Sequence, residues 1–139
     1  MSLYQPDAVT LWAIRAPSGV SVESIFEFTY TADDDDGNPR SRFSEAYRLD
    51  WYDEDFAELH TGGTARELLI DLSRTCRTLD EQALSRLPEG EWNGLYVVYG
   101  GAGDEWKSPD RRPPMPHHVL SIDGVEVKLI DTFHVLIRP

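Results

Sequence analysis

Apolar residues along this chain recur with two periods, one typical of β-strands and one typical of amphipathic helices. Residues 8–15 alternate around β-branched and aromatic side chains, which indicates a strand. Residues 94–99 form an unbroken apolar run beside glycines, as in a central strand that is buried on both faces. The dipeptide Asp123-Gly124 tolerates the positive φ angles of a tight turn and separates two further apolar segments. The pattern therefore predicts strands at 8–15, 94–99, 118–122 and 125–130, the last two as a C-terminal hairpin.

Helical spacing marks three other stretches. Val22, Ile25 and Phe26 recur at that spacing and predict a short amphipathic helix. Thr64 and Thr78 each stand three residues before a Glu, the pattern of a capping box in which the two side chains satisfy free backbone amides. Each Thr therefore predicts a helix that begins just after it. The apolar stripes of these two helices are Leu68, Leu69, Leu72 and Cys76 in the first, and Ala83, Leu84 and Leu87 in the second.

The remaining segments are polar or irregular. Residues 33–40 predict a solvated loop, and residues 100–116 predict a long exposed loop rich in Gly and Pro. A turn of helix is expected near 44–47, followed by an irregular or short extended piece at 50–59. The order of these elements predicts a single α+β domain over residues 1–139. Its sheet, mixed or antiparallel, is expected to have about four strands packed against about three helices.

Composition is consistent with one folded domain. The chain has 139 residues, of which 40% are hydrophobic and 11% aromatic, enough for a core. The start of the chain lacks the pattern of a secretory signal, and no window is apolar enough to cross a membrane, so we expect a cytoplasmic protein. The single cysteine, Cys76, has no partner for an intramolecular disulfide. It is expected to be buried on a helix face, where a free thiol behaves as a small hydrophobe.

Charge is the most uneven property of the chain. Residues 31–58, here called the acidic segment, hold ten Asp or Glu and three Arg, a net charge of −7 out of −12 for the whole chain. Such a field repels nucleic acid and anionic membranes, and it attracts cationic proteins. The acidic segment is interpreted either as a solvated face or as a binding face, and its rings either as core or as interface anchors. Trp12 and Trp92 lie in or beside strand runs and are expected to be core residues. The candidate partner-binding residues are Asp33, Asp34, Asp35, Asp36, Asp50, Trp51, Tyr52, Asp53, Glu54, Asp55 and Glu58.

The same carboxylates do not match known metal or catalytic patterns. When Gly37 is aligned with the glycine of an EF-hand loop, Ala32 and Phe43 occupy the first and last ligand positions, so both ligands are missing. His117 and His118 are adjacent and would point to opposite faces of a strand, which disfavours a zinc site. The carboxylates have no His or Lys at a spacing typical of acid–base catalysis. We therefore expect no catalytic residue, metal or cofactor.

Three stretches form a recognisable combination: Val9-Thr10-Leu11-Trp12, Ser41-Arg42-Phe43 and Leu49-Asp50-Trp51-Tyr52-Asp53-Glu54-Asp55-Phe56. Together they resemble the immunity protein 22 family of bacterial polymorphic toxin systems. The resemblance covers about the first sixty residues. It implies a small cytoplasmic protein without enzymatic activity that binds and neutralises a cognate toxin domain.

Charge and resemblance lead to the same hypothesis. Toxins that attack nucleic acid carry basic clefts, and an acidic protein can occupy such a cleft after electrostatically steered association. The leading hypothesis is an immunity protein whose partner is a basic toxin, expected to be a nuclease. The alternative is a non-catalytic adaptor or regulatory protein that is unrelated to toxins. The sequence leaves the oligomeric state and the mode of inhibition open.

Overall fold

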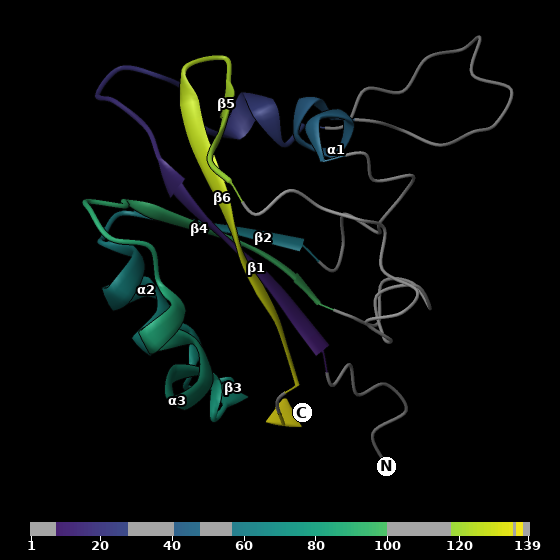
Figure 1. Cartoon of the computed structure of the whole chain (residues 1–139), viewed down its shortest axis with the longest axis vertical. Coiled ribbons are helices and arrows are strands. Elements are labelled where there is room, and N and C mark those ends of the chain that lie inside the picture. The colour runs from purple at the N-terminus through teal and green to yellow at the C-terminus, as the bar shows by residue number, and fades with distance from the viewer. Residues whose placement is uncertain (1–7, 28–40, 48–56, 100–117, 135, 138–139) are drawn as a thin grey trace, which may run out of the picture.

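The computed structural model describes residues 8–27, 41–47, 57–99, 118–134 and 136–137. Figure 1 shows these residues as coloured ribbons, with β1 and β6 running side by side through the molecule. The strands are β1 (Ala8–Arg15), β2 (Ala57–Thr61), β3 (Cys76–Arg77), β4 (Gly94–Tyr99), β5 (Leu120–Ile122), β6 (Val125–His134) and β7 (Leu136–Ile137). The helices are α1 (Arg42–Ala46), α2 (Ala65–Leu72) and α3 (Leu79–Ala83), with 3-10 turns at Glu23–Ile25 and Leu84–Arg86.

Five strands form one antiparallel sheet in the order β2-β4-β1-β6-β5. The first strand in the chain is thus the middle strand of the sheet, where Trp12 lies opposite Tyr96 of β4 and Leu129 of β6. The α+β class predicted from the sequence is confirmed, with five strands in this sheet rather than about four. The additional strand is β2, which forms one edge. A separate pair, β3 and β7, makes a small second sheet.

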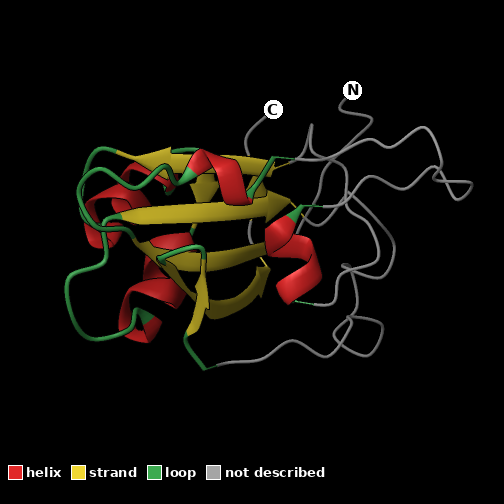
Figure 2. Cartoon of the chain, turned by 90° about the horizontal axis from the view of Figure 1, so that it is seen from above, coloured by secondary structure: helices red, strands yellow, loops and turns green. Residues whose placement is uncertain are grey.

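Helices cover both faces of the sheet, as the view from above shows (Figure 2). On one face, α1 and the first 3-10 turn cover a cluster of rings. Trp12 meets Phe43 edge to face with ring centroids 4.9 Å apart, and Phe26 stacks on Tyr96. The side chain of Tyr47 is fully buried, and its hydroxyl donates a hydrogen bond to the Val127 carbonyl at 3.1 Å. Such ring pairs add about 0.5–1.5 kcal/mol each beyond the burial of their area.

The opposite face is aliphatic and is covered by α2 and α3. Leu69 and Leu72 of α2 and Leu79 and Ala83 of α3 belong to one buried cluster. The sheet contributes Val9, Leu11 and Ala13 of β1 and Leu95 and Val97 of β4 to it. The expectation that the two helices pack on the sheet is therefore confirmed. The capping box predicted at Thr64 is also present, because Thr64 Oγ1 accepts from the Glu67 amide at 3.1 Å and Glu67 Oε1 accepts from the Thr64 amide.

The C-terminal hairpin forms as the Asp-Gly dipeptide predicts. Asp123 and Gly124 have φ angles of 50° and 86°, the left-handed conformation that a two-residue turn of this kind requires. β5 begins at Leu120, two residues later than expected. β6 continues beyond residue 130 to His134, with a shift of register beside Leu11 and Trp12.

Two helical predictions are wrong in part. In the described residues, the helix expected from Val22 onward is only the 3-10 turn, which has no side-chain cap at its start and ends at Ile25. Cys76 was expected on the stripe of α2, but α2 ends at Leu72, and Cys76 lies in β3 opposite Ile137. Cys76 is nevertheless fully buried, as expected for a free thiol.

The capping box predicted at Thr78 is also wrong. Thr78 is left-handed, with φ 68°, because the chain turns there directly from β3 into α3. Its side chain makes no cap hydrogen bond. The Glu81 amide instead donates to Asp80 Oδ1 at 2.9 Å within the first turn.

Candidate partner-binding site

Among the candidate partner-binding residues, Glu58 lies within the part of the chain that the structure describes. It is the second residue of β2, at the edge of the five-stranded sheet. Its side chain is 48% exposed. The other candidates lie outside the described residues: Asp33, Asp34, Asp35, Asp36, Asp50, Trp51, Tyr52, Asp53, Glu54 and Asp55.

Pairing with β4 determines where the side chains of β2 point. Glu58 lies opposite Val97, and His60 lies opposite Leu95. Residues directly opposite each other share a face of the sheet, and Val97 and Leu95 belong to the aliphatic face. Glu58 and His60 therefore lie on the side of α2 and α3, at the margin of that core.

Glu58 belongs to a series of hydrogen-bonded side chains that runs inward from the edge. The hydroxyl of Tyr99 donates a short hydrogen bond to Glu58 Oε1. The thiol of Cys76 lies beside the same hydroxyl, within reach of a hydrogen bond. His60 Nε2 lies 4.0 Å from Glu58 Oε1, is buried, and has no hydrogen-bond partner among the described residues.

The surroundings keep the thiol and the phenol of this series protonated at neutral pH. Burial raises the pKa of Cys76 to about 11, although the hydrogen bond with Tyr99 partly opposes the shift. Burial also raises the pKa of Tyr99 well above its ordinary value, and the neighbouring Glu58 raises it further. A protonated thiol is a poor nucleophile and a poor metal ligand. The arrangement therefore favours a structural role, in which Tyr99 holds the Glu58 carboxylate at the sheet edge.

The described part of the chain also bears on metal binding and membrane insertion. There, no group of three or more His, Cys, Asp or Glu side chains is arranged to hold a metal ion. No helix there has the length and apolar character needed to cross a bilayer.

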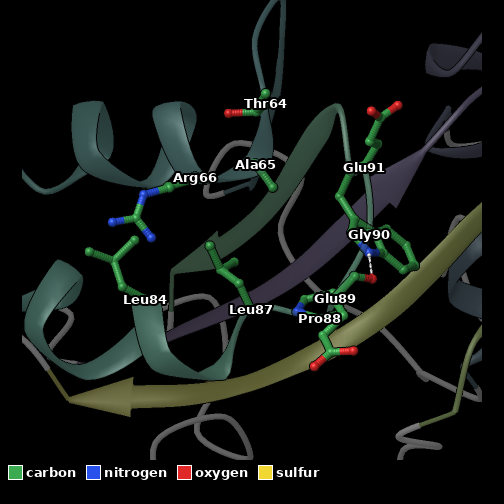
Figure 3. A pocket seen from close by; sticks show the side chains of 10 residues that line it. Thr64, Ala65, Arg66, Leu84, Leu87, Pro88, Glu89, Gly90 and Glu91 are labelled. Atoms are coloured by element: carbon green, nitrogen blue, oxygen red, sulfur yellow. Dashed lines mark hydrogen bonds between the residues drawn. The ribbon is translucent and has the colours of Figure 1, made fainter.

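A second feature is an open groove of about 380 Å³ between the start of α2 and the loop that leads into β4 (Figure 3). The loop is held in place because Ala65 N donates to the Trp92 carbonyl at 2.8 Å and Trp92 Nε1 donates to the Glu89 carbonyl at 2.9 Å. The groove can accept an apolar side chain between charged groups. It is lined by Thr64, Ala65, Arg66, Leu84, Leu87, Pro88, Glu89, Gly90, Glu91 and Trp92.

The position of Gly90 shows how closely this loop packs. Gly90 has φ +108°, and a Cβ placed there would lie 3.2 Å from Arg15 Nη1. The guanidinium of Arg15 in turn lies over the Trp92 ring, 4.5 Å from its centroid. Reasoning from the sequence identified Trp92 as a core residue, which its 4% exposure confirms, but it missed the groove. The groove was missed because its two walls are far apart in the chain. The local sign of it in the sequence is the Pro88-Glu89-Gly90 turn.

Comparison with known proteins places most of the described residues in a family. The family model described as Immunity protein 22 matches residues 9–104, from β1 through β4. The match extends well beyond the first sixty residues, where the resemblance was noted, and includes both β2 and the groove. Searches of curated proteins and of solved structures found no match. The chain therefore belongs to the Immunity protein 22 family, which points to a role in neutralising a toxin.

Proposed function

We propose that this protein binds a cognate bacterial toxin domain in the cytoplasm and neutralises it through its acidic segment, without catalysis. The proposed partner has a basic surface, as a nuclease does around its nucleic-acid cleft. The candidate partner-binding residues named above carry the contact. Family membership supports the toxin as partner over a target unrelated to toxins.

The observation that carries the proposal is the concentration of charge, −7 of the net −12, in residues 31–58. Elsewhere in the described residues, several carboxylates are paired with arginine. Glu126 pairs with Arg15 at 2.7 Å and Asp123 with Arg42 at 3.0 Å. Among the residues that the structure describes, the contacts of the Glu58 carboxylate are with a tyrosine and a histidine and not with an arginine. Its charge is therefore available to a cationic partner.

The test is the rate of association with the cognate toxin domain, which is expected to be encoded directly upstream of an immunity gene, measured over a range of salt concentrations. Electrostatic steering predicts that the association rate falls as ionic strength rises. The variant carrying Asp53→Asn, Glu54→Gln and Asp55→Asn should associate about tenfold or more slowly at low salt. A rate that is independent of salt, together with full binding by this variant, would exclude the acidic segment as the contact.

A matched control separates local from global charge effects. The variant with Glu27→Gln, Glu81→Gln and Glu91→Gln removes the same number of charges at exposed positions outside the acidic segment. It should retain most of the association rate. Equal slowing by both variants would mean that only the net charge of the protein matters.

A further inference from the structure

We propose that β2 is the docking edge for the toxin, and that an extended toxin segment adds to it as a sixth strand of the sheet. The inference rests on the proposed function and specifies how the partner is held. Main-chain hydrogen bonds along β2 would provide affinity, and side chains on the two faces of the added strand would provide specificity.

The first support is that, among the described residues, β2 lies at the edge of the sheet and pairs on one side only, with β4. Proteins commonly protect an edge strand with Pro, Lys, a bulge or a very short length. Residues 57–61 contain neither Pro nor Lys, and their pairing with β4 runs from Ala57 to Thr61 without a shift of register. The other edge strand, β5, has three residues against five in β2. Between the two edges, β2 is the better template.

The second support is that β2 is already held in place. Tyr99 of β4 fixes the Glu58 carboxylate, and the backbone of β2 packs closely on β4 at Gly94, where a Cβ would lie 3.2 Å from the His60 carbonyl oxygen. A preformed edge lowers the entropy cost of binding, since only the partner has to become extended.

The third support concerns the chemistry of the occupant. An added strand places one of its residues directly beside Glu58 on the same face, and a Lys or Arg there would gain a charged cross-strand pair. Such a residue is expected on a basic toxin. A second copy of this chain would instead bring together two molecules that each carry a net charge of −12, which disfavours self-association.

Amide hydrogen exchange with residue resolution tests the proposal on the full chain, free and bound to a catalytically inactive form of the upstream-encoded toxin domain. Successive amides of a strand point to opposite sides, so those facing β4 are protected already and those facing outward are not. Strand addition should slow the outward-facing amides of residues 57–61 about tenfold or more. The amides of β5 serve as the internal control and should not change.

Proline variants test whether the outward N–H groups form hydrogen bonds. Leu59 and His60 are adjacent, so the amide of one faces β4 and the amide of the other faces outward. Of the variants Leu59→Pro and His60→Pro, the one that loses the amide facing β4 should be destabilised, and the one that loses the outward amide should remain folded. The folded variant should bind the toxin about three- to tenfold more weakly than the Ala variant at the same position. The Ala variant controls for loss of the side chain.

The outcomes distinguish this inference from the proposed function. Tight toxin binding with unchanged exchange in β2 would overturn strand addition and leave the immunity function standing. Absence of any binding would overturn both. A free protein that dimerises in sedimentation, with its outward β2 amides already protected, would show that the edge is used by a second copy and would also overturn the proposal.

Discussion

Tyr99 connects two residues that the sequence presents as unrelated. Glu58 is part of the acidic segment, and Cys76 is expected to be a small buried hydrophobe. In the structure, the Tyr99 hydroxyl donates to Glu58 and lies beside the Cys76 thiol, so the edge carboxylate and the buried thiol are neighbours of one phenol. The exposure of Glu58 and the burial of Cys76 could be predicted from residue type. Their connection could not, because it depends on three strands meeting.

The raised pKa of Cys76 predicts how stability depends on pH. Folding raises this pKa from its ordinary value of 9.0 to about 11, so the fold favours the protonated thiol. The protonated thiol makes its full contribution to the free energy of unfolding below the ordinary pKa, and this contribution is lost as pH rises toward the folded-state pKa. Between pH 9.0 and about 11, the free energy of unfolding should therefore fall more steeply for the wild type than for Cys76→Ala.

Urea unfolding of both proteins at several pH values checks this expectation. The Ala variant should be less stable at pH 7, because it leaves a small cavity, but its pH curve should be flatter. Parallel curves for the two proteins would show that the thiol has the same pKa in the folded and unfolded chains.

At the scale of elements, the two Thr-x-x-Glu strings show how far local sequence determines structure. Both precede a helix, so both helix starts were predicted correctly to within a residue. Only Thr64 has the extended backbone that lets its hydroxyl reach the amide three residues later. Thr78 is left-handed because the chain must turn from β3 into α3, and this requirement is tertiary.

The two threonines form a matched pair for mutagenesis. Thr64→Ala should lower the free energy of unfolding by about 1 kcal/mol, because it removes a helix cap. Thr78→Ala should change it by less than about 0.5 kcal/mol, and Thr78→Gly should be neutral or stabilising, because glycine adopts the left-handed conformation without strain. Chemical denaturation measures all three. Equal losses for Thr64→Ala and Thr78→Ala would show that the Thr64 cap contributes nothing.

At the scale of the whole molecule, the family match covers less of the chain than the five-stranded sheet does. The match ends at residue 104, before the C-terminal hairpin. The hairpin strand β6 nevertheless pairs with β1 along its whole length, and its side chains enter both cores. Val125, Val127 and Leu129 pack with the rings, while Ile130 and Phe133 pack on the aliphatic side.

A chain that ends after residue 104 should therefore not fold. It would leave one edge of the central strand β1 unpaired and expose the apolar residues on both faces that β6 now covers. Circular dichroism during heating should show no cooperative transition for this fragment, whereas the full chain should show one. Cooperative unfolding of the fragment would mean that the family-matched region is stable by itself.

The candidate site combines what could and could not be predicted. The acidic segment and the family resemblance were visible in the sequence, since charge and motifs are properties of the chain itself. The edge position of Glu58 was not visible, because it depends on pairing between β2 and β4, which are separated by α2, β3 and α3. The groove was missed for the same reason, as α2 and the loop before β4 form its two walls.

The sequence alone determined the features that depend on neighbouring residues: the strands at 8–15 and 94–99, the Asp123-Gly124 turn, the Thr64 cap and the core positions of Trp12 and Trp92. Tertiary structure decided which strands are neighbours, and with that which edge is open. It also placed Cys76 in a strand and, through the shift of register in β6, put Phe133 on the opposite face of the sheet from Val127 and Leu129, although all three are odd-numbered. Local preferences specify backbone conformation over a few residues. Strand pairing depends instead on which apolar faces are buried together by segments that are distant in the chain. Thr10 and Thr132, for example, lie on paired strands with their hydroxyls 2.8 Å apart.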